Sequence, residues 1–174
     1  GLVLSPIVPI YRDAEVTMML GDCRARGLFT CTQFRRYDFA EMADRIRGDL
    51  PDLTHVFTVR GDGPDDFAAL VQEGRTLPAY RPEVDATEVK LVLYTSGTTG
   101  DPKAIRAPYT RFDNVASIGP AIGLQSEDRP YTGLSLTHAN AQLVTLGNVL
   151  KMGLRGVISR KFSKSRLWDI CRHY

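Results

Sequence analysis

The sequence predicts an α/β fold in which alternating strands and helices form mostly parallel sheet layers. Short apolar runs rich in β-branched residues alternate with helical patterns along most of the 174 residues. The apolar fraction is 43% and the charged fraction 24%, as in an ordinary globular domain. The sequence shows no internal repeat and no low-complexity tract. Regular alternation of this kind is typical of helices packed on parallel strands.

The first part of the chain is expected to contain three strands and three helices. The strands are residues 3–8, 27–31 and 55–59. Asp13 is the expected N-cap of the first helix and Asp38 that of the second. The second helix is expected to end at Pro51, because proline cannot continue a helix. A short third helix follows at residues 65–71. The apolar positions of the first two helices are Val16, Met19, Leu20, Met42, Ile46 and Leu50.

A stretch without periodicity then divides the chain, because residues 74–85 contain two prolines and no helical or strand pattern. We therefore expect one α/β unit at residues 1–73, a connecting loop at 74–87 and a second unit at 88–174. The elements expected in the second unit are a strand at 88–94, a helix at 112–123, a strand at 131–136, a helix at 139–152, a strand at 156–159 and a terminal helix from Ser163 or Ser165.

Charge and cysteine content exclude several classes of protein. The formal net charge of +2 gives no argument for binding nucleic acid or a membrane surface. No segment approaches the roughly 20 apolar residues of a spanning helix, so we expect no membrane insertion. Cys23, Cys31 and Cys171 are odd in number and show no C-x-x-C spacing. This pattern is typical of free thiols in a reducing compartment and predicts a cytoplasmic protein.

The segment at residues 94–103 reads Tyr-Thr-Ser-Gly-Thr-Thr-Gly-Asp-Pro-Lys and directly follows a strongly apolar strand. Gly97 and Gly100 let main-chain N–H groups approach a ligand closely. Lys103 adds a positive point charge. The hydroxyl groups belong to Thr95, Ser96, Thr98 and Thr99. Because ligands of α/β sheets bind where strands end, this pattern predicts a phosphate-binding loop.

The segment is not the P-loop of the large NTPase class. In that motif the lysine directly follows the last glycine and precedes Ser or Thr. Here Asp101 and Pro102 separate Gly100 from Lys103, and Ala104 follows. A GTPase-like or kinase-like reading is therefore disfavoured.

Residues 92–103 resemble the AMP-binding signature of the adenylate-forming superfamily, S-G-T-T-G-x-P-K after an apolar lead-in. That superfamily includes acyl- and aryl-CoA synthetases, nonribosomal peptide adenylation domains and luciferases. One departure is Ala104, where the family usually has glycine. Residues 1–12 look like an earlier family strand, and residues 134–142 look like its next motif. The resemblance implies part of the large N-terminal domain of an acyl-CoA synthetase.

The resemblance also implies a reaction and its participants. A carboxylate attacks the α-phosphate of ATP, and the thiol of coenzyme A then attacks the acyl-adenylate, with Mg²⁺ neutralising phosphate charge. Lys103 and His138 are the implied catalytic residues, although a histidine before a helix is often only a cap. The implied ATP-binding residues are Thr95, Ser96, Gly97, Thr98, Thr99, Gly100 and Lys103. The metal ligands are expected outside these residues.

Several readings stay open at this point. Both ends of the chain look cut, so we expect an excerpt that has no ligase activity alone. The acceptor could be a carrier protein in place of coenzyme A. The chain could also be a nucleotide-binding module that lost catalysis. Parts of the sequence look like ligases of the cyclohexanecarboxylate type and others like the carnitine type. The substrate is therefore expected only to be a small or medium carboxylic acid.

Overall fold

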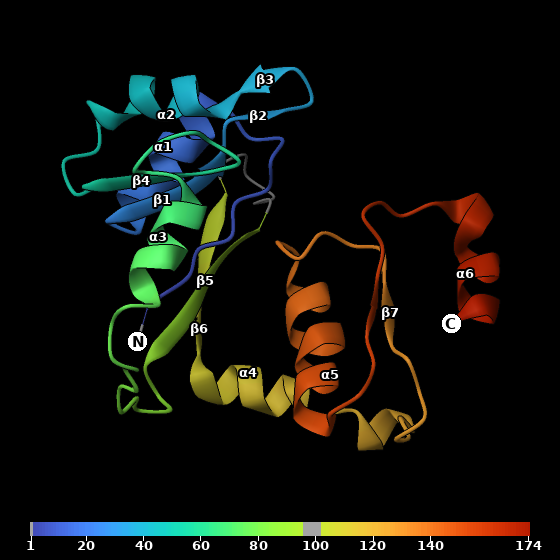
Figure 1. Ribbon diagram of the computed structural model, residues 1–174. Helices are drawn as coiled ribbons and strands as arrows, with labels where there is room; N and C mark the ends of the chain where they lie inside the picture. The colour runs from blue at the N-terminus through green and yellow to red at the C-terminus, as the bar shows by residue number, and fades with distance from the viewer. Residues whose placement is uncertain (1, 96–101) are drawn as a thin grey trace. The chain divides into compact units, whose positions relative to one another are not determined.

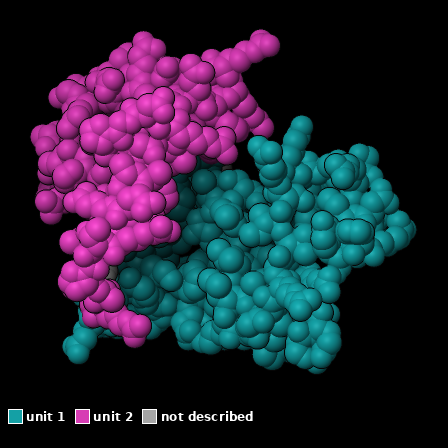
Figure 2. Space-filling view, viewed as in Figure 1, with its two compact units in different colours: residues 1–8, 83–174 teal, residues 9–82 magenta. Residues whose placement is uncertain are grey.

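The computed structural model describes residues 2–95 and 102–174. Internal contacts divide the chain into two compact units, which Figure 2 shows in different colours. One unit is residues 9–82, and the other joins residues 1–8 to residues 83–174. The domain boundaries expected from the sequence stay a prediction.

A parallel pair of strands forms the centre of the unit at residues 9–82 (Figure 1). Strand β1 (Gly27–Cys31) pairs with β4 (His55–Val59), with Gly27 opposite His55 and Cys31 opposite Val59. The rings of Phe29 and Phe57 stack across the pair, with centroids 4.9 Å apart. Both strands have the bounds predicted from the sequence.

The six apolar positions that the sequence predicted are buried, five of them in two helices of this unit and Leu50 just after the second. Helix α1 is Asp13–Asp22 and α2 is Phe39–Arg47. The buried side chains include Val16, Met19, Leu20, Met42, Ile46 and Leu50. Asp38 is confirmed as the N-cap of α2, because its carboxylate accepts a hydrogen bond of 2.9 Å from the Glu41 N–H. The helix ends before Gly48 and does not extend to Pro51.

The prediction that Asp13 caps α1 was wrong by one residue. Asp13 is the first residue of α1, and the N-cap is Arg12, whose backbone N–H donates to the Glu15 carboxylate over 3.2 Å. Helix α3 (Phe67–Gly74) begins two residues later than expected, because Asp66 caps it by accepting from the Ala68 N–H over 2.8 Å.

A short antiparallel hairpin in this unit was not predicted. Strand β2 (Gln33–Phe34) pairs with β3 (Tyr37–Asp38). The two residues between them, Arg35 and Arg36, have φ values of 49° and 63°. Such two-residue turns favour asparagine and glycine, so the arginine pair gave no hairpin signal in the sequence.

The second unit contains a longer antiparallel hairpin, which Figure 1 shows as two adjacent arrows. Strand β5 (Val89–Thr95) pairs with β6 (Lys103–Pro108). The β5 strand was predicted within one residue, but β6 was not predicted. Of the strand expected at residues 3–8, only Leu4 forms a bridge, with Leu91.

Helices and one further strand pair complete this unit. Helix α4 (Tyr109–Ala116) is followed by η1 (Pro120–Ile122), and β7 (Tyr131–Thr132) pairs in parallel with β8 (Val157–Ile158). The helix predicted at 139–152 consists of a π-helical segment, η2 (Asn140–Leu146), and α5 (Gly147–Met152). The terminal segment contains η3 (Lys164–Arg166) and α6 (Leu167–His173). Among the described residues, no helix has the length and apolar character needed to span a membrane.

Candidate nucleotide-binding site

The β5–β6 hairpin places two candidate residues opposite each other at the end where the glycine-rich segment connects its strands. Thr95 is the last residue of β5 and Lys103 the first of β6, and they are partners in the strand register. The Thr95 hydroxyl donates to the Lys103 carbonyl over 3.5 Å. The glycine-rich segment is therefore the connection between two paired strands. The remaining predicted phosphate-binding residues, Ser96, Gly97, Thr98, Thr99 and Gly100, lie outside the described residues.

The hairpin is fixed by packing on one face and by a cation–π contact at its base. Leu91 and Leu93 of β5 are buried. The ammonium group of Lys90 lies 3.5 Å from the centre of the Phe112 ring on α4. Cation–π contacts of this kind orient the two elements that they join. The strand that leads to Thr95 is therefore held firmly against the following helix.

Lys103 is exposed, and its ammonium group is available to an anion. Within the described part of the chain, no acidic side chain forms an ion pair with it. The sequence had placed Lys103 at the end of a loop, whereas the structure makes it the start of a strand. A strand position restricts the backbone from which the flexible lysine side chain extends.

His138 lies in the segment between β7 and η2, and three hydrogen bonds hold it. Its backbone N–H donates to the Ser135 carbonyl over 2.9 Å, and its carbonyl accepts from the Gln142 N–H over 3.1 Å. The Asn140 N–H donates to Nδ1 of the ring over 3.2 Å. Because Nδ1 accepts, a neutral ring carries its proton on Nε2. The ring therefore has the local capping contact considered above and also an exposed donor.

The hairpin and the helix that follows His138 share one hydrophobic cluster. Leu143 of η2 is buried against Leu91 and Leu93 of β5, and Ala139 packs against the same cluster. Between Lys103 and His138 themselves, both described residues, the structure shows no hydrogen bond. The structure therefore connects the two candidate residues through a common core and not through direct contact.

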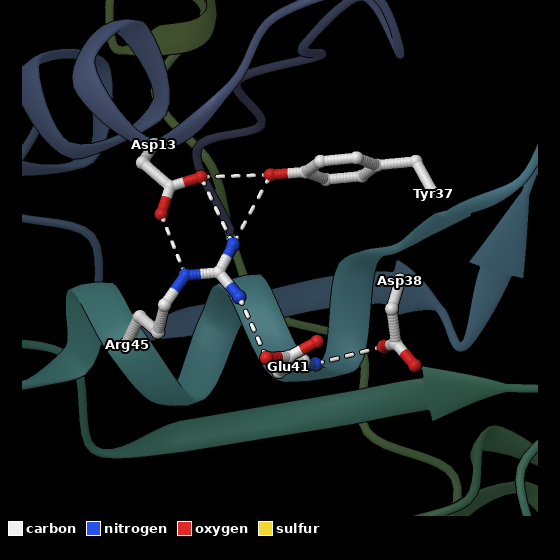
Figure 3. A network of polar contacts seen from close by, with 5 residues as sticks. All are labelled: Asp13, Tyr37, Asp38, Glu41 and Arg45. Carbon is white, nitrogen blue, oxygen red and sulfur yellow. Dashed lines mark hydrogen bonds and ion pairs between the residues drawn. The ribbon is translucent and has the colours of Figure 1, made fainter.

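A network of polar contacts that sequence reasoning missed joins α1 to α2 (Figure 3). The Arg45 guanidinium contacts the Asp13 carboxylate through Nε at 2.9 Å and Nη2 at 3.2 Å. The Tyr37 hydroxyl donates to Asp13 over 2.7 Å, and Glu41 lies 3.3 Å from Arg45. Asp13 and Arg45 are 32 positions apart, so no local pattern could have revealed the pair.

The network shifts the pKa values of its members. The hydrogen bond from Arg45, followed by that from Tyr37, lowers the pKa of Asp13 from 3.8 to about 2. The hydrogen bond to Asp13 raises the pKa of Arg45 and also that of Tyr37. Since the charges of Asp13 and Arg45 already satisfy each other, we interpret the network as a link between helices and not as a binding site.

Metal-ligating side chains do not gather in the described ranges 2–95 and 102–174. No group of three or more histidine, cysteine, aspartate or glutamate side chains lies close enough there to hold an ion. Cys23, Cys31 and Cys171 form no disulfide bond with one another.

Comparisons with known proteins agree with this geometry. The family model described as AMP-binding enzyme matches residues 1–174. Human long-chain fatty acid transport protein 1 is 37% identical over 107 residues, which make up 60% of this chain and 17% of that protein.

Two solved structures share the fold at 22% identity each. A long-chain-fatty-acid-CoA ligase from Archaeoglobus fulgidus has a TM-score of 0.80, covering 98% of this chain and 33% of its own. An anthranilate CoA ligase in complex with anthranoyl-AMP has a TM-score of 0.77, covering 97% and 32%. This chain thus spans a third or less of the length of these three proteins. The likenesses confirm the predicted α/β class, that of the N-terminal domain of adenylate-forming enzymes.

Proposed function

Because this chain belongs to the AMP-binding enzyme family, we propose that it forms part of an ATP-dependent acyl-CoA synthetase. In the proposed reaction a carboxylate attacks the α-phosphate of ATP, giving an acyl-adenylate and pyrophosphate. The thiol of coenzyme A then attacks the acyl carbonyl, giving acyl-CoA and releasing AMP. The observation that carries this proposal is the β5–β6 hairpin, which brings Thr95 and Lys103 to the two ends of the glycine-rich connection.

The role of the hairpin is electrostatic and positional. Pyrophosphate leaves with negative charge that the transition state already begins to develop. The Lys103 ammonium, next to donors of the glycine-rich connection, would stabilise that charge. Hydroxyl groups such as that of Thr95 would orient the phosphate oxygens. Mg²⁺ would neutralise part of the phosphate charge, and none of the residues named here is proposed as its ligand.

His138 is proposed to border the reacting carboxylate and the α-phosphate. The Asn140 N–H holds Nδ1 as an acceptor, so Nε2–H is the donor that could reach an anionic oxygen. A neutral donor of this kind stabilises developing negative charge without removing a proton from the substrate.

The proposed substrate is a carboxylic acid, since the solved neighbours are named as ligases of a long-chain fatty acid and of anthranilate. The sequence favoured a small or medium acid, and the likeness to a long-chain fatty acid transport protein adds longer acids to the range. A thermal-shift screen of the full-length protein with carboxylates of increasing length would find the preferred class.

Coenzyme A is the favoured acceptor because both solved neighbours are named CoA ligases. Loading of a carrier protein is the alternative. Residues 1–174 alone are expected to form no acyl-CoA, and a cytoplasmic location stays a prediction.

The central test is Lys103→Ala in the full-length protein. We expect carboxylate-dependent ATP–pyrophosphate exchange to fall about 100-fold, the size of effect seen when a charge-stabilising donor is removed. Conversion of preformed acyl-adenylate to thioester should change much less. Lys161→Ala, at another exposed lysine, is the matched control and should leave both rates unchanged. Exchange that survives Lys103→Ala would contradict the role of Lys103.

A further inference from the structure

The side chain of Asn148 is a buried polar junction in the unit that carries the candidate site. Only 1% of Asn148 is exposed. Its Oδ1 accepts from the Gly119 N–H over 2.6 Å. Its Nδ2 donates to the Val144 carbonyl over 2.7 Å and to the Val115 carbonyl over 3.3 Å. One amide therefore joins η2, the end of α4 and the turn before η1, using both its donor and its acceptor groups.

The bond to Val144 lies where π-helical and α-helical structure meet. The Gly147 N–H, at the end of η2, donates to the Gln142 carbonyl five residues earlier and also to Val144. The Val144 carbonyl thus accepts both from the Gly147 N–H and from the Asn148 side-chain amide. π-Helical turns are rare and frequently lie at functional sites.

The extra residue of a π-turn has a geometric consequence. Each residue of a helix advances the chain by about 100°, because a turn contains 3.6 residues. Reverting η2 to α-helical hydrogen bonding would therefore rotate its N-terminal end by about that angle relative to α5. His138 immediately precedes this end, and its carbonyl bonds to the Gln142 N–H over 3.1 Å.

Close packing fixes both sides of the π segment. A Cβ atom at Gly147 would lie 3.0 Å from the Ala116 Cβ, so α5 lies directly on α4. Leu143 is held in the cluster with Leu91 and Leu93. A change of hydrogen-bond register would therefore shift the residues before Leu143, His138 among them, relative to α5.

From these contacts we propose that Asn148 is a positioning residue that holds η2 in its π register and thereby sets the orientation of His138. This inference rests on the proposed function, because that function gives His138 its role. Asn148 itself touches no reacting group.

A double-mutant cycle in the full-length protein tests the proposal. Asn148→Leu keeps the shape of the side chain and removes all three hydrogen bonds. We expect it to lower kcat/KM for the carboxylate in ATP–pyrophosphate exchange about tenfold. In the His138→Ala background the same change should cost less than about twofold, because residues that act through one another are not additive. Asn114→Leu, on the exposed surface of α4, is the matched control and should have no effect. Equal losses in both backgrounds would overturn the proposal, as would an unimpaired His138→Ala enzyme.

Two further measurements keep the test decisive. If Asn148→Leu does not fold, Asn148→Ser, which retains a donor, is subjected to the same cycle and the same criterion. A crystal structure of either variant should show the Gly147 N–H bonded to Leu143 in place of Gln142. A retained bond to Gln142 would overturn the proposal. This crystallographic readout is independent of the reaction, so it tests the hydrogen-bond register even if the wild-type protein forms no acyl-adenylate. Failure to form acyl-adenylate would contradict the proposed function and not the role of Asn148 in the register.

Discussion

Two polar junctions, one in each unit, join helices by contrasting means. Asn148 is an uncharged amide with 1% exposure that ties α5 to α4 and η2. Asp13 and Arg45 form an ion pair between α1 and α2, with side chains 41% and 44% exposed. Each junction makes several hydrogen bonds of ordinary length. Water can replace the lost partners of the exposed pair but cannot reach those of Asn148.

The difference shows that burial, more than charge, decides what a polar contact contributes. Exposed ion pairs contribute little, because solvent screens the charges and ordering two long side chains costs entropy. When a buried donor or acceptor loses its partner, the folded state is destabilised by the full desolvation free energy of that group. The pKa of Asp13 is lowered to about 2, yet this shift arises at an exposed carboxylate. We therefore expect the neutral junction to dominate stability.

The largest expected effect is that of Asn148→Leu on stability. The change leaves the Gly119 N–H without its partner, whereas the carbonyls of Val115 and Val144 still accept from backbone N–H groups. At roughly 1–3 kcal/mol for a buried donor without a partner, the free energy of unfolding should fall by about 2 kcal/mol. Urea denaturation of the full-length protein measures this loss. If the loss were no greater than that of Asn114→Leu on the surface, the contrast between the two junctions would collapse.

An intermediate effect is expected at the N-cap of α2, beside the ion pair (Figure 3). The Asp38 carboxylate accepts from the Glu41 N–H over 2.9 Å. Asp38→Ala should therefore lower the free energy of unfolding by about 1 kcal/mol, as at other caps. Asp38→Asn keeps an oxygen acceptor and serves as the control, with a smaller loss in the same urea titration. Equal losses for the two variants would show that the cap bond is not responsible.

Features encoded in adjacent residues could be predicted from the sequence, and the two central strands of the first unit are an example. β1 and β4 are short apolar runs whose ends are clearly marked in the sequence, so their bounds were predicted correctly. β6 escaped prediction because most of its residues are exposed and its composition is mixed. β6 forms a strand because its backbone hydrogen-bonds to that of β5. The sequence of residues 103–108 alone does not indicate this pairing.

The candidate site likewise contains some features that the sequence predicts and others that only the structure shows. The spacing of the glycine-rich segment was sufficient to predict a phosphate-binding loop and to single out Lys103. The strand register that places Lys103 opposite Thr95 required the structure. Asn148 and Gly119 are 29 positions apart, and an asparagine within a helical pattern reads as an ordinary surface residue. Long-range polar partners are set by packing, which a local pattern does not contain.

The smallest expected effect is that of Asp13→Asn, and its pH dependence identifies the cause. The pKa of Asp13 is lowered from 3.8 to about 2 in the folded protein. A lowered pKa means that the ionised carboxylate stabilises the folded state above pH 3.8, and that this contribution disappears as the pH falls through about 2.

The stability difference between wild type and Asp13→Asn should therefore be small at neutral pH and shrink in acid. Added salt should also reduce it, since exposed charges are screened. Urea titrations of both proteins across this pH range measure the difference. The contributions of the other carboxylates cancel, because both proteins contain them. Arg45→Gln, which removes the other member of the ion pair, is the matched variant. If Asp13→Asn destabilised the protein as much as Asn148→Leu, exposure would not be the property that separates the two junctions.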